Sequence, residues 1–280
     1  MNRKTAFRLL LSVFLNAGTQ LSAQDSPPPL SADEGAELRS KFAARGLPTS
    51  LQELDDWYRR VPEGKNAADW FEEASMRLVH AQGERQRQLP VVGRKDVLEI
   101  GDALDDETAR LARAFLNENR TALKYAREGA VFEESRYPID LKLGYEVPLP
   151  HLAPLRDLAR TLYLESLVLT HDGHTEGAVD SVRVMYAIAR SLESEPVLAS
   201  QTVRIAIESM TTSMFSKNLS ARPFSPAELD EVSRLSKSDV GLNSCYRAFV
   251  ADALTATFQP QGLEGSHHQV GDAGFLATYL

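Results

Sequence analysis

The chain has one cysteine among 280 residues, so Cys245 has no partner for an internal disulfide. Its neighbours Ser244 and Tyr246 lie in an apolar pattern, which predicts a small buried side chain rather than a reactive thiol. The sequence also lacks a Gly-x-Ser-x-Gly motif, a Ser-x-x-Lys motif and a Gly-rich phosphate loop. The common signatures of hydrolases and nucleotide-binding enzymes are therefore missing, although a triad assembled from distant residues would leave none.

Positive charge is scarce, because the 31 Lys and Arg residues are outnumbered by 39 Asp and Glu residues, which gives a net charge of −8. Residues 1–23 contain three of these bases and no acid, so their removal would leave 28 bases against 39 acids, or −11. Phosphate backbones and anionic lipid surfaces repel such a chain. We therefore expect neither nucleic acid nor a membrane surface as a partner.

Histidines are few, and one short segment could suggest a metal site. His171-Asp172-Gly173-His174 places two imidazoles and a carboxylate in one turn. The spacing lacks the two histidines on one helical face that a helical zinc motif requires, whereas a histidine at a helix end is favoured by the helix dipole. His267 and His268 lie between glycines and are expected to be solvated. The sequence thus predicts no metal site and no cofactor.

Long apolar runs are also missing, and the N-terminus instead has the three parts of an export signal. Arg3, Lys4 and Arg8 come first, residues 9–15 are apolar, and Ala23 ends a stretch of small residues suited to signal peptidase. The apolar run is shorter than the roughly 20 residues that cross a bilayer. We expect cleavage near Ala23, a periplasmic or extracellular location and no transmembrane segment in the mature chain, with an uncleaved anchor as the alternative.

The remainder is long enough, at 43% hydrophobic residues, to bury one sizeable core. Residues 27–29 are three prolines, which favour an extended tether. The expected organisation is a signal peptide over 1–23, a tether and N-terminal segment over 24–47, and a single helical domain over 48–280. The apolar end, Phe275–Leu280, is expected to pack on the body or to lead into an element that continues past Leu280.

Three amphipathic helix patterns follow one another between residues 150 and 218. In the first two, apolar or small side chains recur at spacings of three and four residues, which places them on one helical face. These side chains are Leu155, Leu158, Ala159, Leu162, Ser166 and Leu169, then Ala178, Val179, Val182, Met185, Tyr186, Ala189 and Leu192. Since neither helix can bury its stripe alone, the sequence predicts an all-α fold, an irregular array or bundle of some eight helices.

Other helix starts are marked by capping residues. They are Thr49 with Gln52, Asn66, the acidic run 105–107, and Ser225 with Glu228. We expect the helix from residue 105 to continue through Ala126, and a last helix from about Leu242 to Phe258. Two stretches, 88–101 and 128–150, break the helical pattern with Pro, Gly and short alternating runs. They are expected to be long packed loops that could hold a minor β-pair.

The turn between the first two helices resembles a tetratricopeptide helix pair. Ser166 stands where the helices approach, Gly173 at the turn, and Ala178 and Val182 in the second helix. A broader pattern resembles exported helical proteins of environmental bacteria, to which no activity is assigned. It consists of Trp57-Tyr58, Val61-Pro62, Asn66-Ala67-Ala68, Arg136-Tyr137-Pro138, Leu149-Pro150-His151-Leu152 and Glu195-Pro196. The resemblance implies export and a helical fold, and it supplies no catalytic residue.

One cluster is the candidate ligand-binding site. It consists of Arg136, Tyr137, Asp140, Tyr145 and His151. A guanidinium fork, two phenols, a carboxylate and an imidazole near a helix start could hold an anionic or sugar ligand. The alternative is that Tyr and Arg fix this loop to the helices, with Arg136 paired to a carboxylate and Tyr137 buried. Trp57, Tyr58 and Trp70 are expected in the core.

Two functions remain open. The first is an exported, non-enzymatic binding or scaffolding protein with a protein or glycan partner. The second is a hydrolase of cell-envelope or environmental polymers that uses paired carboxylates near the 128–151 loop. The acids available for such a pair are Asp55, Asp56, Glu72, Glu73, Glu133, Glu134 and Asp140. Most of them belong to polar helix faces, so no catalytic residue is assigned.

Overall fold

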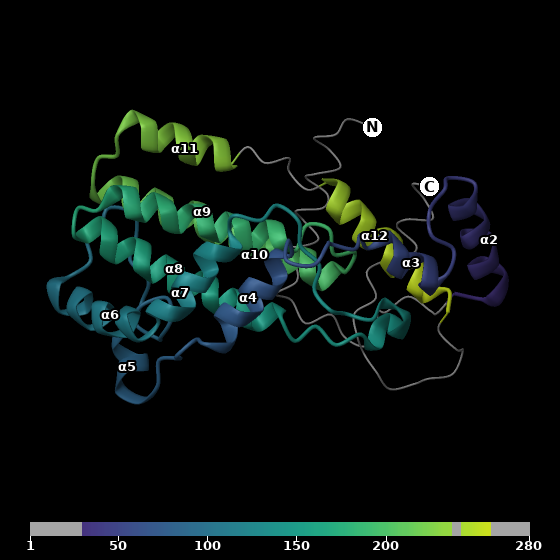
Figure 1. The fold of residues 1–280 in the computed structure, drawn as a ribbon, viewed down its shortest axis with the longest axis horizontal. Helices are drawn as coiled ribbons and strands as arrows, with labels where there is room; N and C mark the ends of the chain where they lie inside the picture. The colour runs from purple at the N-terminus through teal and green to yellow at the C-terminus, as the bar shows by residue number, and fades with distance from the viewer. Residues whose placement is uncertain (1–29, 237–241, 259–280) are drawn as a thin grey trace.

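The computed structural model describes residues 30–236 and 242–258, and these residues form helices without any strand (Figure 1). In chain order the helices are α2 (Ala32–Ala43), α3 (Leu51–Trp57), α4 (Ala67–Met76), α5 (Gly83–Gln88), α6 (Asp106–Glu118), α7 (Arg120–Gly129), the 3-10 helix η1 (Leu141–Glu146), α8 (Leu152–His171), α9 (Thr175–Ser191), α10 (Leu198–Ala221), α11 (Pro226–Ser236) and α12 (Leu242–Ala256). The all-α prediction is confirmed. The predicted signal peptide, the prolines of the tether, His267, His268 and the apolar end lie outside the described residues.

Side-chain caps fix where several of these helices begin. Asn66 accepts from the Ala68 amide at 3.2 Å, and Asp105 accepts from the Thr108 amide at 2.8 Å, as predicted. At α11, Ser225 and Glu228 form the predicted reciprocal cap. The prediction for α3 is wrong by one residue. Ser50 is the cap, and the Glu53 carboxylate accepts from the amide and hydroxyl of Thr49.

The helices α8, α9 and α10 pack against one another as the centre of the fold, which Figure 1 shows as three neighbouring rods. Gly173 has a φ of +83° in the turn between α8 and α9, a conformation that glycine adopts without strain. The Ser166 hydroxyl donates to the Ala178 carbonyl at 3.2 Å, and both residues are fully buried. The close helix pair predicted from Ser166, Gly173 and Ala178 is therefore present.

Five further helices surround this centre: α4 and α6 pack on α8, α7 pairs with α4, α5 lies against α6, and α11 covers α9. The prediction of one helix from residue 105 through Ala126 is wrong, because the chain breaks into α6 and α7 at Asn119. The buried Asn119 amide group donates to the Val79 carbonyl and accepts from the Val79 amide. The Asn119 side chain thus satisfies the backbone of the segment at Val79, at the point where α6 ends and α7 begins.

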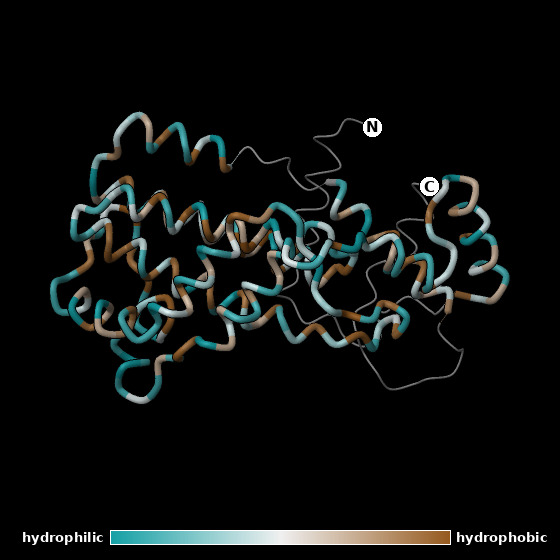
Figure 2. The backbone as a smooth tube through the Cα atoms, viewed as in Figure 1, coloured by the Kyte–Doolittle hydropathy of each residue, from teal (hydrophilic) through white to brown (hydrophobic). Residues whose placement is uncertain are grey.

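The helices α2, α3, η1 and α12 form the other end of the elongated molecule (Figure 1), and we call them the small end. One apolar core runs through both ends, since Phe42 and Leu254 belong to the same cluster of buried side chains as Leu158 and Met185. Figure 2 shows apolar residues recurring along α8 and α9 and again in the small end.

The two loops that break the helical pattern differ from their predicted form. Residues 88–101 contain only an isolated bridge between Pro90 and Lys95, and residues 128–150 contain η1, so neither described stretch holds a β-pair. The predicted alternation holds for Tyr137, Ile139 and Leu141, which are buried. It fails at Leu143, which is 50% exposed because a 3-10 helix does not keep a period of two.

The prediction that Trp57, Tyr58 and Trp70 lie in the core is correct only for Tyr58, which is fully buried. Trp57 and Trp70 are half-buried. Trp70 lies beside Phe132, with ring centroids 6.2 Å apart. Cys245 is also only half-buried, in contrast to the prediction.

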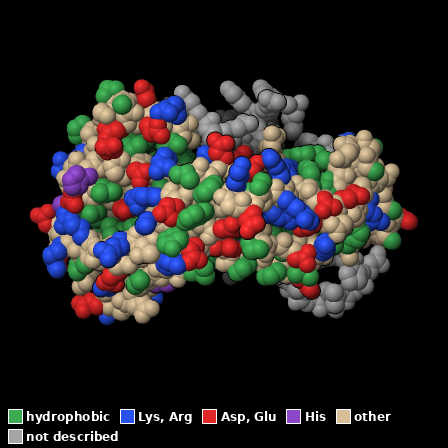
Figure 3. Space-filling view, viewed as in Figure 1, with side chains coloured by type: hydrophobic (Ala, Val, Ile, Leu, Met, Phe, Trp, Pro, Cys, Tyr) green, Lys and Arg blue, Asp and Glu red, His purple; other side chains and the backbone are tan. Residues whose placement is uncertain are grey.

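The surface carries acidic and basic side chains interspersed with apolar ones on the face shown in Figure 3. Among the described helices, none combines the length and the apolar character that a bilayer crossing requires.

Candidate functional site

The five predicted ligand-binding residues separate into two groups. Arg136, Tyr137 and His151 belong to one connected set of side chains, described below. The exposed Asp140 caps η1 by accepting from the Lys142 amide at 3.1 Å. Tyr145 is turned to α12, where its hydroxyl donates to the Asp252 carbonyl at 2.9 Å. The contacts of Asp140 and Tyr145 are therefore with partners other than those of Arg136, Tyr137 and His151, and ligand binding by the five residues stays a prediction.

Glu195, in the link between α9 and α10, is the centre of the connected set. Its carboxylate has no exposed surface and accepts from the Tyr58 hydroxyl at 3.3 Å. It also accepts from the Ser200 hydroxyl at the start of α10, and it lies 3.2 Å from Nε2 of His151. We call Tyr58, Tyr137, His151, Glu195 and Ser200 the polar cluster.

Two aromatic rings complete the polar cluster. The Tyr137 ring stacks on the His151 ring with centroids 4.2 Å apart and planes 11° from parallel. The hydroxyl of Tyr58 accepts from the Tyr137 amide at 2.8 Å, while the Tyr137 hydroxyl bonds Ser191 at 2.8 Å. Arg136 caps the cluster, with its guanidinium 4.3 Å from the centre of the Tyr58 ring.

Charge and burial decide the protonation of these groups. Burial raises the pKa of both Tyr58 and Tyr137, and the neighbouring Glu195 carboxylate adds to the rise at Tyr58, so both phenols stay protonated and can donate. Arg136 pairs with Asp55 at 2.9 Å, as predicted from the sequence. Burial raises the pKa of Glu72, a half-buried residue of α4, and the imidazole of His151 opposes that rise.

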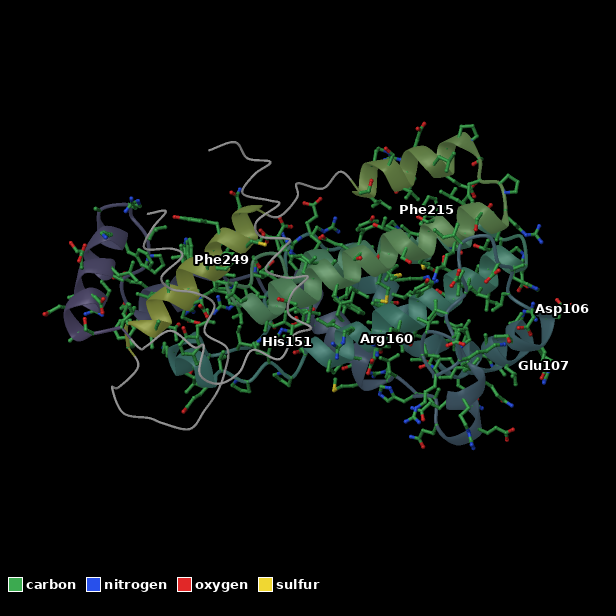
Figure 4. The ribbon with its side chains drawn as sticks, turned by 180° about the vertical axis from the view of Figure 1, so that it is seen from behind. Asp106, Glu107, His151, Arg160, Phe215 and Phe249 are labelled. Atoms are coloured by element: carbon green, nitrogen blue, oxygen red, sulfur yellow. The ribbon has the colours of Figure 1, made fainter. Side chains whose placement is uncertain are left out.

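The polar cluster is placed to join segments of the chain. Its residues come from the end of α3, the 130–151 loop, the start of α8, the α9–α10 link and the start of α10. Figure 4 shows His151 near the middle of the molecule, where the bundle meets the small end. Since Tyr58, Tyr137 and Glu195 expose no surface and bond one another, their hydrogen-bonding capacity is already used inside the protein.

Three members of the polar cluster were not predicted as site residues: Tyr58, which was expected in the core, Glu195 and Ser200. Glu195 and Ser200 lie in and just after a short link between two helix patterns, 44 and 49 positions from His151. Glu195 stands directly before Pro196, in the short link between α9 and α10. This position is the sequence feature that could have pointed to it. No residue spacing could have paired it with Tyr58, 137 positions away.

A surface hollow lies at the small end, between the α2–α3 turn and α3. It has a volume of about 330 Å³ and is lined by Gly46, Leu47, Pro48, Glu53, Asp56 and Trp57. We call it the Trp57 hollow. Glu53 and Asp56 are exposed at its rim, and the guanidinium of Arg247 from α12 lies 4.5 Å from the centre of the Trp57 ring. Of the three aromatic residues that the sequence predicts in the core, Trp57 is the one that lines an open hollow.

The histidine turn is held by ion pairs. The Asp172 carboxylate pairs with Arg113 from α6, which lowers its pKa, and it also contacts Nδ1 of His171 at 3.0 Å. Nε2 of His171 faces Asp106 at the end of the bundle labelled in Figure 4. Across the residues that the structure describes, no three His, Cys, Asp or Glu side chains converge as a metal ion would need.

No family model, curated protein or solved structure matches this chain.

Proposed function

We propose that this chain is an exported, non-enzymatic helical protein that binds or scaffolds a partner, with the Trp57 hollow as its recognition site. The observation that carries the proposal is the contrast between two places. The polar cluster has the side-chain chemistry of a reactive site but is closed, whereas the Trp57 hollow is open and offers an aromatic side chain between apolar and acidic groups.

The closed state of the polar cluster weighs against catalysis there. A catalytic group must come within about 2.6–3.2 Å of the substrate proton that it transfers. Glu195 has no exposed surface and already accepts from two hydroxyls while it faces His151. Breaking these bonds to admit a substrate would leave buried polar groups unpaired, which costs about 1–3 kcal/mol for each group.

The raised pKa of Glu72, which His151 opposes, supports the hydrolase alternative. A general acid in a glycosidase needs such a pKa. Three of the other acids considered are engaged in ion pairs: Asp55 pairs with Arg136, Glu73 with Arg77 and Glu134 with Arg59. In the Trp57 hollow, hydrogen bonds from Thr49 lower the pKa of Glu53, which is the opposite of what a general acid requires.

A fluorescence titration tests the proposal. The chain has two tryptophans, so a Trp70→Phe variant reports on Trp57 alone. We expect at least one member of a panel of soluble cell-envelope glycan fragments and short peptides to change Trp57 emission saturably and to be recovered intact by mass spectrometry. Cleavage of panel members that is lost with Glu72→Gln would contradict the proposal, and so would a panel that leaves Trp57 emission unchanged.

A further inference from the structure

We propose that the Trp57 hollow binds an organic cation, namely an alkylammonium or alkylguanidinium group. This inference rests on the proposed binding function and names the chemical class of the ligand. It depends on the charge at the rim, on the shape and polarity of the walls, and on the cation that Trp57 already contacts.

The rim of the Trp57 hollow is negative. Glu53 and Asp56 are three positions apart on α3, so they project from one face of the helix. Among the described residues that line it, none is Lys, Arg or His. The Glu53 carboxylate accepts from the Thr49 amide and hydroxyl, and these bonds keep its pKa low, so it remains ionised in mildly acidic solution. Within this lining a positively charged group would therefore meet two carboxylates, while the Arg247 guanidinium of α12 lies over the Trp57 ring.

The walls of the hollow are partly apolar. Leu47, Pro48 and Trp57 supply the apolar part of the lining, which suits the methylene groups that carry an ammonium or a guanidinium. An inorganic cation would gain nothing from these walls, since hard metal ions require several oxygen ligands. A neutral ligand would leave the two carboxylates without a partner of opposite charge.

The face of the Trp57 indole ring carries partial negative charge, which attracts cations. The Arg247 guanidinium already lies over its ring, and the Arg247 side chain donates to the Trp57 carbonyl. These contacts hold the indole in one orientation, so a ligand meets a preformed wall. The loop that faces it is fixed as well, because Leu47 donates its amide to the Phe42 carbonyl at 3.0 Å.

The experiment uses the full chain with Trp70→Phe and follows Trp57 emission. The probes are butylammonium, butylguanidinium and neutral butanol, and then the capped tripeptides Gly-Lys-Gly, Gly-Arg-Gly and Gly-Gln-Gly. The first set tests a free cation, and the second tests a cation carried by a peptide. We expect saturation with the cationic members of at least one set, no saturation with butanol or Gly-Gln-Gly, and weaker binding in about 0.5 M salt because exposed charges are screened.

The decisive variant is Glu53→Gln with Asp56→Asn. The amide oxygen of the introduced glutamine can still accept from Thr49, so the start of α3 should be kept, and circular dichroism checks this. We expect at least tenfold weaker cation binding than in wild type. The control, Glu176→Gln with Asp230→Asn, removes the same charge from exposed positions in α9 and α11 and should leave affinity within twofold.

Three results would overturn the inference: equal affinity in the decisive and control variants, butanol binding as tightly as butylammonium, or cations that leave Trp57 emission unchanged. If cations fail while a neutral glycan fragment saturates Trp57, the ligand class is wrong and the proposed function stands. If neither cations nor any member of the wider panel saturates Trp57, both are wrong.

Discussion

Glu195 is a buried carboxylate whose described partners are two hydroxyls and one imidazole, with no Lys or Arg among them. These partners are hydrogen-bonding groups rather than permanent cations. Each of these bonds ties the α9–α10 link to a different segment: α3, α8 and α10. The side chain is therefore expected to be one of the most sensitive positions for stability.

Replacing Glu195 by Ala should lower the free energy of unfolding by about 3–5 kcal/mol, because it leaves the buried Tyr58, Ser200 and His151 groups without their acceptor. Glu195→Gln keeps one oxygen acceptor and should cost less. Urea denaturation of both variants measures the difference. Equal stability of Glu195→Ala and wild type would mean that the polar cluster contributes nothing to the fold.

Asp252, on α12, should make the protein less stable as the pH rises. Burial raises its pKa to about 7, whereas an unfolded Asp titrates near 3.9. Between these values the folded chain keeps a proton that the unfolded chain has released. The contribution of Asp252 to stability is therefore full below about pH 4 and is lost as the pH rises through about 7.

Asp252→Asn removes this loss, since the amide cannot ionise. We expect the variant to melt at a higher temperature than wild type at pH 8 and at nearly the same temperature at pH 4. The shift should be about 2–4 °C for each kcal/mol recovered in a domain of this size. Scanning calorimetry at the two pH values measures it, and an equal shift at both would show that ionisation is not the cause.

Part of the site could be predicted residue by residue. Arg136 and Tyr137 stand next to each other in the sequence, and the expectation that Arg136 pairs with a carboxylate and that Tyr137 is buried is confirmed. Asp140 and Tyr145 were grouped with them because they are near in sequence. The backbone turns into η1 after Asp140, and Tyr145 lies within this helix with its hydroxyl bonded to α12.

At the scale of the elements, helix starts were more predictable than helix ends. A cap is a local hydrogen bond between residues two or three positions apart, so Asn66, Asp105 and Ser225 could be recognised from sequence alone. The break at Asn119 depends on Val79, 40 positions away, and no local pattern reveals it. The 3-10 helix η1 was missed because its apolar spacing also fits a strand.

The contact between α4 and α7 depends on a glycine. A Cβ atom added at Gly129 would lie 2.9 Å from Cβ of Trp70 and 3.1 Å from the Phe71 ring, so the two helices approach too closely for any side chain there. Gly129→Ala should therefore destabilise the fold by about 1–3 kcal/mol through overpacking, although alanine is the better helix former.

Gly177→Ala in α9 is the matched control. Its added Cβ would meet only the end of the half-buried Leu169 side chain, at 3.3 Å, which can shift. We expect this variant to be as stable as wild type or more stable by up to about 1 kcal/mol. Chemical denaturation of both variants compares them, and a Gly129→Ala protein as stable as Gly177→Ala would contradict the close contact.

At the scale of the whole molecule, composition and periodicity were enough to predict an all-α fold, because an amphipathic stripe is visible in any one helix. The arrangement of the helices was not predictable beyond the α8–α9 pair. It depends on contacts between residues far apart in the chain, such as Tyr58 with Glu195. The elongated shape, with a small end joined to a bundle, follows from these contacts (Figure 1).

In the proposed function the polar cluster is a closed structural junction, and the Trp57 hollow is the recognition site. Hydrogen exchange of the Tyr137 amide, which donates to the buried Tyr58 hydroxyl at 2.8 Å, tests this claim most directly. If the cluster is closed, this amide should exchange only through global unfolding, with a free energy of opening equal to that from urea denaturation. Exchange through a local opening of much lower free energy would show that solvent reaches His151 and Glu195, and it would contradict a closed junction.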